Sequence, residues 1–358
     1  MSPRPAVFFE SKQKKSARFS ITTKLRRDNQ KIKQTKRVGL PRALLYYKYW
    51  PLWETFFREL GAEVIVSPET TKMIKNLSIS FAPNEDCYST KLYYGHVMAL
   101  KDKVDYLFIP RLGSVHKTNS GCPKFVGLAE TLQSMFDDLP PILMPYYSKA
   151  KAGHGIKRLL NIMFNIGFRF TKNPLKIILA GIKAIRAQKR HIKKITMTEK
   201  RYHKWEKNRR IIDNKEALRI ALAGHSYILN DHFASLEIRD MLESLNVEYI
   251  TSEQLPRKFI ERQMQKLDFN LYFDYEREIL GTIMHFLERK TVDGIIHLII
   301  FSCGPDSVTA EMALQYAKRE GTIPLLQLTF DELTGKAGLS TRVEAFIDLL
   351  ERRRDRCQ

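Results

Sequence analysis

The stretch GIIHLIIFSCGPDS, residues 294–307, joins an almost wholly apolar run to a short turn and a polar segment. Such a run is typical of a strand that is buried on both faces of a parallel sheet. Cys303 follows the run, and the Gly-Pro-Asp turn leads into a predicted helix that Asp306 or Ser307 is able to cap. The stretch therefore predicts a strand, a turn and a helix, with a cysteine at the carboxyl end of the strand.

The rest of the chain repeats this alternation. We predict strands at residues 36–40, 62–66, 105–110, 141–144, 217–223, 247–250, 294–301 and 324–329. Predicted helices lie at residues 42–60 (interrupted at Pro51), 69–76, 88–101, 124–136, 233–245, 275–290, 307–319 and 339–353. Helical connections between strands give parallel sheets. We therefore expect an α/β fold with two open parallel-sheet domains, flavodoxin-like or Rossmann-like, and a basic helical insertion between them.

The chain has 358 residues, is 44% hydrophobic and carries a formal charge of +21. This apolar content excludes global disorder. Residues 1–37 hold 12 Lys and Arg against 2 Asp and Glu, and residues 149–210 hold 19 against 2, so the rest is mildly acidic. No apolar run is long enough to cross a bilayer, and residues 1–37 lack the apolar core of a secretory signal. We predict a cytoplasmic protein.

These patterns divide the chain into four parts. The predicted boundaries are a basic, disordered tail at residues 1–36, an α/β domain at 37–148, a basic helical insertion at 149–213 and a second α/β domain at 214–358. Residues 149–210 have two interpretations: helices packed on the α/β body with their Lys and Arg in water, or an amphipathic surface for a membrane or an acidic partner. No nucleic-acid-binding module is recognisable, which argues against nucleic acid as a partner.

Three cysteines occupy equivalent positions in the predicted fold. Cys87 (NEDCYSTK), Cys122 (NSGCPKF) and Cys303 each lie in a loop at the carboxyl side of a parallel strand, just before a helix. This edge of a sheet is where open α/β folds bind ligands, and a helix start lowers a thiol's pKa. Two facing domains would bring the three thiols together as a metal or iron–sulfur site, although unrelated loop cysteines give the same pattern. We expect Cys357 to be an exposed thiol without a role.

Four further residues are candidates for lining the cleft between the domains. His225 and Tyr227 follow the strand at residues 217–223, Asp306 follows Cys303, and Glu85 precedes Cys87. His96 is interpreted as a core histidine. The chain contains no GxGxxG, Walker or GxSxG motif, which argues against nucleotide binding and serine-hydrolase chemistry. The sequence assigns no catalytic residue.

Several motifs resemble a known family. They are GLPRALLYYKYWPLWETFFRELGAEVIVSPET (residues 39–70), EDCYSTKLYYGHV (85–97), CPKFVGL (122–128), GHSYILND (224–231), FSCGPDS (301–307) and TRVEAFIDLL (341–350). With these motifs in this order, the chain resembles the acyl-CoA dehydratase activase-related family, akin to the iron–sulfur subunits of 2-hydroxyacyl-CoA dehydratases. The resemblance covers about residues 37–112, 122–144 and 218–353. It leaves out the tail and much of residues 149–210.

The resemblance implies a cofactor and a partner. In the related subunits three such cysteines hold a 4Fe–4S cluster with one open iron, and an ATP-dependent activator passes an electron to the dehydratase, which removes water from a 2-hydroxyacyl-CoA. Carried over by motif, the ligands are Cys87, Cys122 and Cys303. The leading interpretation is an iron–sulfur redox protein. The alternatives are an (R)-2-hydroxyacyl-CoA dehydratase-like subunit that binds an acyl-CoA, and a non-redox scaffold with a structural metal. The oligomeric state stays open.

Overall fold

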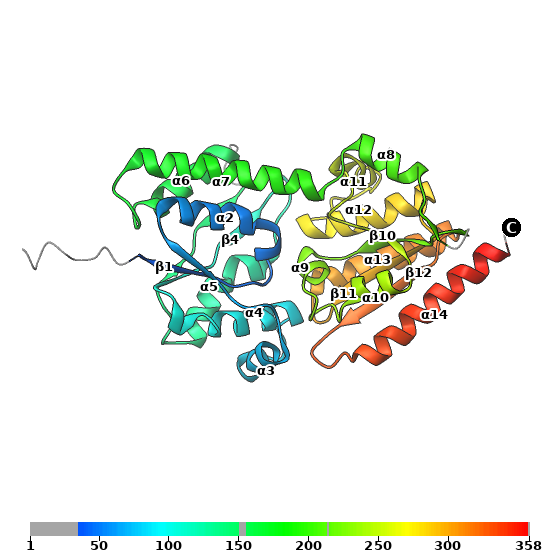
Figure 1. Cartoon of the computed structure of the whole chain (residues 1–358), viewed down its shortest axis with the longest axis horizontal. Helices are drawn as coiled ribbons and strands as arrows, with labels where there is room; N and C mark the ends of the chain where they lie inside the picture. The colour runs from blue at the N-terminus through cyan, green and yellow to red at the C-terminus, as the bar shows by residue number, and fades with distance from the viewer. Residues whose placement is uncertain (1–34, 150–154, 213–214, 357–358) are drawn as a thin grey trace, which may run out of the picture. The chain divides into compact units, whose positions relative to one another are not determined.

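The computed structural model describes residues 35–149, 155–212 and 215–356, and the first of its sheets lies in the N-terminal half (Figure 1). Four strands form this sheet in the order β2-β1-β3-β5, and every pair is parallel. Their bounds are Arg37–Leu40 (β1), Glu63–Val66 (β2), Tyr106–Phe108 (β3) and Ile142–Leu143 (β5). The tail up to residue 34 and Cys357 lie outside the described residues, so the predictions for them stay untested.

The second sheet has the same internal order as the first. Its strands run β10-β9-β11-β12, again with parallel pairs only. The bounds are Arg219–Ala223 (β9), Glu248–Thr251 (β10), Gly294–Ile300 (β11) and Leu325–Phe330 (β12). All residues of β9 and β11 are buried, as expected for central parallel strands. The predicted α/β fold with two parallel sheets is confirmed, and in each sheet the order reverses beside the first strand, where such folds bind ligands.

Helices connect and cover the strands. In the first half they are α2 (Tyr46–Leu60), α3 (Lys72–Phe81), α4 (Tyr88–Met98), the 3₁₀ turn η1 (Lys101–Lys103) and α5 (Pro123–Met135). In the second half they are α9 (Ser226–Asn230), α10 (Ile238–Ser244), α11 (Arg257–Met264), α12 (Asp274–Arg289), α13 (Gly304–Glu320) and α14 (Lys336–Asp355). Apolar residues from these helices complete the cores on both faces of each sheet.

The structure corrects two predicted helices. The helix expected from residue 42 begins at Tyr46, because Leu44 takes a positive φ of 49° that a helix does not accommodate. It continues through Pro51, which is buried near the helix start. The helix expected over residues 233–245 shortens to α10, because Leu236 and Glu237 have φ angles of 53° and 60°.

Several short elements were not predicted. They are β4 (Arg111–Ser114) and β6 (Tyr146–Ser148), which pair in parallel, the hairpin strands β7 (Ile211–Ile212) and β8 (Lys215–Glu216), and the helices α9 and α11. A polar strand such as β4, with the sequence RLGS, has neither alternation nor an apolar run to mark it.

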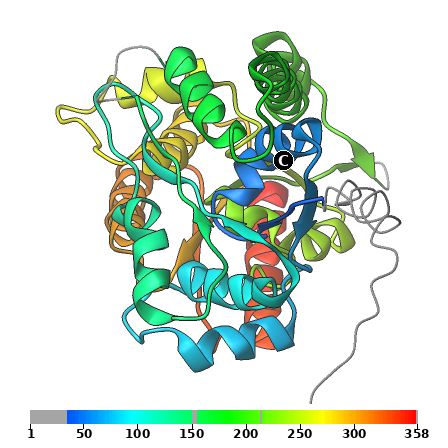
Figure 2. The same cartoon turned by 90° about the vertical axis from the view of Figure 1, so that its left-hand side faces the viewer.

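The basic segment forms three helices: α6 (Gly155–Gly167), α7 (Pro174–Ile195) and α8 (Glu199–Lys207). In both views α7 lies along α2 (Figures 1 and 2), and it buries Ile177, Ala180 and Ala184. Tyr202 of α8 is fully buried beside Phe259 of α11. One face of the segment is therefore core, while an interaction role for its outward face stays a prediction. None of the helices described is long and apolar enough to cross a membrane.

The two halves share buried contacts. Tyr88 and Leu92 of α4 belong to the core cluster of the second sheet, and the Tyr88 N–H donates to the carbonyl oxygen of Phe301 at 3.4 Å. Lys48 of α2 forms a 2.5 Å ion pair with Glu278 of α12. These contacts bring the carboxyl ends of the two sheets together. The domain boundaries predicted from sequence remain a proposal.

Candidate metal centre

Cys87, Cys122 and Cys303 line one cavity, together with His225, Tyr227 and Glu276. Each cysteine occupies the position just before a helix: Cys87 before α4, Cys122 before α5 and Cys303 before α13. Cys303 follows β11 and Cys122 follows the short strand β4, while α3 separates Cys87 from β2. Three loops that are distant in the sequence therefore bring three thiols to the same cavity.

Burial decides the protonation of two of these thiols. It raises the pKa of Cys87, although the thiol lies 3.1 Å from the hydroxyl of Thr90. It raises the pKa of Cys122 to about 11. The lowered pKa expected from their helix starts is therefore wrong for both, because loss of water outweighs the nearby backbone. Both thiols are protonated at neutral pH until a cation replaces the proton.

His225 connects the cysteines to two buried carboxylates. It precedes α9, and its Nε2 lies 3.3 Å from Glu276 Oε1 and 3.9 Å from Asp306 Oδ2. The imidazole stacks on Tyr227 with ring centroids 4.8 Å apart and also contacts the thiol of Cys303. Burial alone would lower the pKa of His225, but the two carboxylates outweigh burial and raise it well above its usual value.

Asp306 holds this group against the second sheet. The fully buried carboxylate accepts the backbone N–H of Ile300 at 2.7 Å, and its other oxygen lies 3.6 Å from His297 Nε2. Burial would raise the pKa of Asp306, but His225 and His297 outweigh burial and lower it. Asp306 thus joins the end of β11 to the first turn of α13, whose cap position belongs to Cys303.

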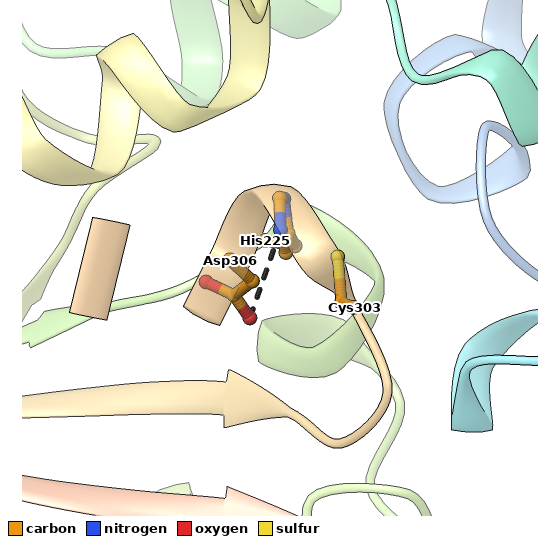
Figure 3. Close-up of side chains that lie close together, drawn as sticks. All are labelled: His225, Cys303 and Asp306. Atoms are coloured by element: carbon orange, nitrogen blue, oxygen red, sulfur yellow. Dashed lines mark ion pairs between the residues drawn. The ribbon is translucent and has the colours of Figure 1, made fainter. Parts of the chain in front are cut away.

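Donor atoms of His225, Cys303 and Asp306 all lie within 4.8 Å of one another, and Figure 3 shows the three side chains together. The buried atoms without a hydrogen-bond partner in the described chain include both ring nitrogens of His225, Glu276 Oε2 and Asp306 Oδ1. Buried polar atoms are rarely left unpaired, so this group is a candidate site for an ion or cofactor.

The predicted cleft residues fall into two groups. His225 and Tyr227 line the cavity, and Asp306 lies beside them. The side chain of Glu85 is exposed, and only its carbonyl oxygen contributes, by accepting the Ser302 hydroxyl at 3.3 Å. His96 is buried in the core between the hydroxyls of Ser67 and Thr70, as interpreted from the sequence.

Two buried residues of this site were not predicted from the sequence. Glu276 is on the same face of α12 as the core residues Ile279 and Ile283, three and seven positions later, so helical periodicity was a usable signal. His297 is the single polar residue within the apolar strand β11. In both cases the marker is a polar side chain at a position that the pattern assigns to the core.

A second cavity lies next to the cysteine cavity. It has a volume of about 250 Å³, and its lining includes Lys48, Glu253, Asp274 and Glu278. Tyr275 lines both cavities, and its hydroxyl lies 3.3 Å from that of Tyr49. Burial raises the pKa of Glu253, which favours its neutral, hydrogen-bond-donating form. The two sites are therefore neighbours with one shared wall.

Two family models match the chain. Residues 37–255 match a model described as CoA enzyme activase uncharacterised domain, and residues 167–350 match a model described as 2-hydroxyglutaryl-CoA dehydratase, D-component. Each match covers more than half of the chain. The first includes residues 149–210, so the expectation that much of the basic segment lies outside the resemblance was wrong. No curated protein matches. The resemblance carried by the motifs is thus confirmed, and the chain belongs to the family of CoA enzyme activase-related and 2-hydroxyacyl-CoA dehydratase proteins.

Proposed function

We propose that this chain is an iron–sulfur redox component of a 2-hydroxyacyl-CoA dehydratase-type system, with a 4Fe–4S cluster held by Cys87, Cys122 and Cys303. The observation that carries the proposal is that these three cysteines, from three separate loops, line one cavity. Cysteine thiolates are the usual ligands of iron–sulfur clusters. The family description "D-component" supports a protein that works with another component.

The residues around the cavity suit such a group. Thiolates that are buried away from water need a positive charge beside them, and a bound metal group supplies that charge. The starts of α4, α5 and α13 point their partial positive charge toward the thiolates, which stabilises an anionic cluster. Lys124 also lines the cavity and forms an ion pair with the buried Asp86. When bound, the cluster supplies one-electron chemistry.

The partner we propose is an ATP-dependent activator or a related redox protein that delivers the electron. The description "CoA enzyme activase" of the family supports this choice. The contribution of this chain is to shield the cluster: Tyr227, Phe125 and Phe273 form apolar parts of the cavity wall. Exclusion of water around a cluster changes its reduction potential and limits attack by oxygen.

Metal analysis of protein purified without oxygen tests the proposal. We expect about four irons and four sulfides per chain, from the composition of the cubane, and a brown colour that bleaches in air. Single replacements Cys87→Ala, Cys122→Ala and Cys303→Ala should each remove most of the iron. Cys357→Ser, at the remaining cysteine, is the matched control and should keep it. One bound zinc without iron would favour the structural-metal scaffold, and full iron in any of the three alanine variants would refute the ligand set.

A second candidate is a dehydratase-like catalytic subunit, and the neighbouring cavities favour it. The 250 Å³ cavity with its charged lining shares Tyr49 with an apolar cavity of about 210 Å³, so a polar head and an acyl chain would both find space. Incubation of the iron-loaded protein with a 2-hydroxyacyl-CoA, an activator and ATP separates the candidates. Formation of the enoyl-CoA supports the subunit, and reduction of the cluster without product supports the redox component.

A further inference from the structure

Three cysteines provide three of the four outer ligands that a 4Fe–4S cluster needs. We propose that His225 provides the fourth, through Nδ1, while Glu276 and Asp306 hold its Nε2 edge. This inference rests on the proposed function, because it assumes that the three cysteines hold a cluster. It goes beyond that function because it replaces the open iron with a complete set of protein ligands.

The position of His225 supports this role. The residue is 4% exposed, it lines the same cavity as the three cysteines, and it contacts the thiol of Cys303. One donor atom of His225 and the sulfur of Cys303 lie within 4.8 Å of each other. An iron bound to Cys303 would therefore lie close to the imidazole.

One edge of the imidazole faces two carboxylates. Nε2 lies 3.3 Å from Glu276 and 3.9 Å from Asp306, and neither ring nitrogen has a hydrogen-bond partner among the described residues. Histidines that bind metals usually direct the other ring N–H to a carboxylate, which fixes the tautomer and the ring orientation. Iron bound at Nδ1 would take the place of one proton of the imidazolium, and the other proton would stay on Nε2 beside the carboxylates.

The carboxylates are themselves fixed in place. Asp306 accepts the N–H of Ile300 and lies beside His297, and Glu276 is 3% exposed on α12. Because elements from β11, α12 and α13 converge on one imidazole, its orientation is set before any ligand binds. A core histidine with only a packing role needs no such pair of buried carboxylates.

Other buried histidines near the site are less suitable. His297 is fully buried within β11 and does not line the cavity. His96 has both ring nitrogens occupied by the hydroxyls of Ser67 and Thr70. Among the described histidines, His225 alone lines the cysteine cavity.

Histidine ligation has a functional consequence. A cluster with four protein ligands has no open iron for a substrate hydroxyl, so it suits electron transfer more than Lewis-acid elimination. A neutral imidazole in place of a thiolate also makes the cluster less negative, which raises its reduction potential. His225 thus favours the redox component over the catalytic subunit.

Hyperfine spectroscopy of the reduced cluster in the full chain tests the inference. We expect a ¹⁴N coupling in wild type that becomes a ¹⁵N coupling when only histidine is labelled. The coupling should disappear in His225→Gln and in His225→Cys, the second of which restores four ligands without nitrogen. His96→Gln, which also removes a buried histidine, should keep the coupling.

The outcomes separate the inference from the proposed function. Wild type that holds a cluster without histidine coupling would overturn the inference alone, as would a coupling that persists in His225→Cys. Wild type that holds no cluster would overturn the proposed function and the inference together. Because the labelling experiment uses wild type, the result does not depend on whether a variant folds.

Discussion

The two sheets have the same strand order but differ in the length and burial of their strands. Strands of the first sheet have two to four residues, whereas those of the second have four to seven, and β9 and β11 are buried throughout. The first half supplies Cys87 and Cys122 from loops. The second supplies Cys303 together with the buried group around His225. The difference indicates that the second half provides a buried frame formed by His225, Cys303 and Asp306. Loops of the first half place the thiols of Cys87 and Cys122 beside this frame.

The largest effect is expected from breaking that frame at Asp306. Asp306→Ala removes the acceptor for the Ile300 N–H and the counter-charge of His225, and both partners stay buried. Breaking a buried ion pair on one side costs about 3–5 kcal/mol. Urea unfolding of the metal-free protein should show this loss. Ser307→Ala, at the exposed neighbouring residue, is the control. A loss of stability below about 1 kcal/mol in Asp306→Ala would contradict the role of Asp306 in this frame.

The next largest effect is the pH dependence of stability that comes from His96, in the first half. Burial, helped by the charge of Arg42, lowers the pKa of His96 from 6.5 to about 3. Below pH 6.5 the unfolded chain therefore binds a proton that the folded chain excludes, and stability falls with decreasing pH down to about pH 3. At pH 5 the loss is about 2 kcal/mol relative to pH 7. His96→Gln should flatten the profile between pH 7 and 5, and an unchanged slope in this variant would disprove the assignment.

A smaller effect is expected at the contact between the halves. Lys48→Met leaves Glu278 without its 2.5 Å partner in a cavity wall. We expect a loss of about 1–2 kcal/mol, because an ionised group keeps its desolvation cost when its partner is removed. The double variant Lys48→Met/Glu278→Gln should recover part of it, which a double-mutant cycle measures. Lys101→Met, in an exposed pair with Asp138, is the control and should cost less than about 1 kcal/mol. Equal losses of stability in Lys48→Met and Lys101→Met would show that the ion pair between the halves contributes no more than an exposed pair.

Sequence patterns predicted what depends on local periodicity and missed local backbone turns and contacts between elements that are distant in the sequence. The apolar run of β11 and the alternation of strands and helices around it were sufficient to predict the parallel sheets. The position of Cys303 at the end of that strand was sufficient to predict that it lies at the edge where such sheets bind ligands. The start of α2 failed because the positive φ of Leu44 has no local marker. Glu276 was missed because its importance comes from its 3.3 Å approach to His225, which lies 51 positions earlier and on another element. Local sequence patterns determine helices and strands, whereas a site formed between such elements depends on how they pack together.

The smallest effect on stability is expected on the outward side of α6 and α7. Residues 155–195 contain 11 Lys and Arg and no Asp or Glu, and Leu175 and Leu179 are 68% and 58% exposed. Exposed substitutions such as Arg186→Glu and Lys193→Glu should change the free energy of unfolding by less than about 0.5 kcal/mol. If this face binds an anionic membrane, each reversal should weaken binding to acidic vesicles by about 1 kcal/mol or more, and salt should suppress that binding.

Vesicle sedimentation at low and high salt measures this difference. Neutral vesicles are the first control. The second is Ile177→Ala, which acts on the buried face of α7 and should lower stability while leaving the charged face intact. Binding to acidic vesicles that is salt-sensitive and lost in the reversal variants would assign the outward face to a membrane. Absence of binding at low salt would leave an acidic protein as the partner to test, or a face that only keeps the helices hydrated. The result shows whether the charge of this chain serves a surface separate from the cysteine cavity.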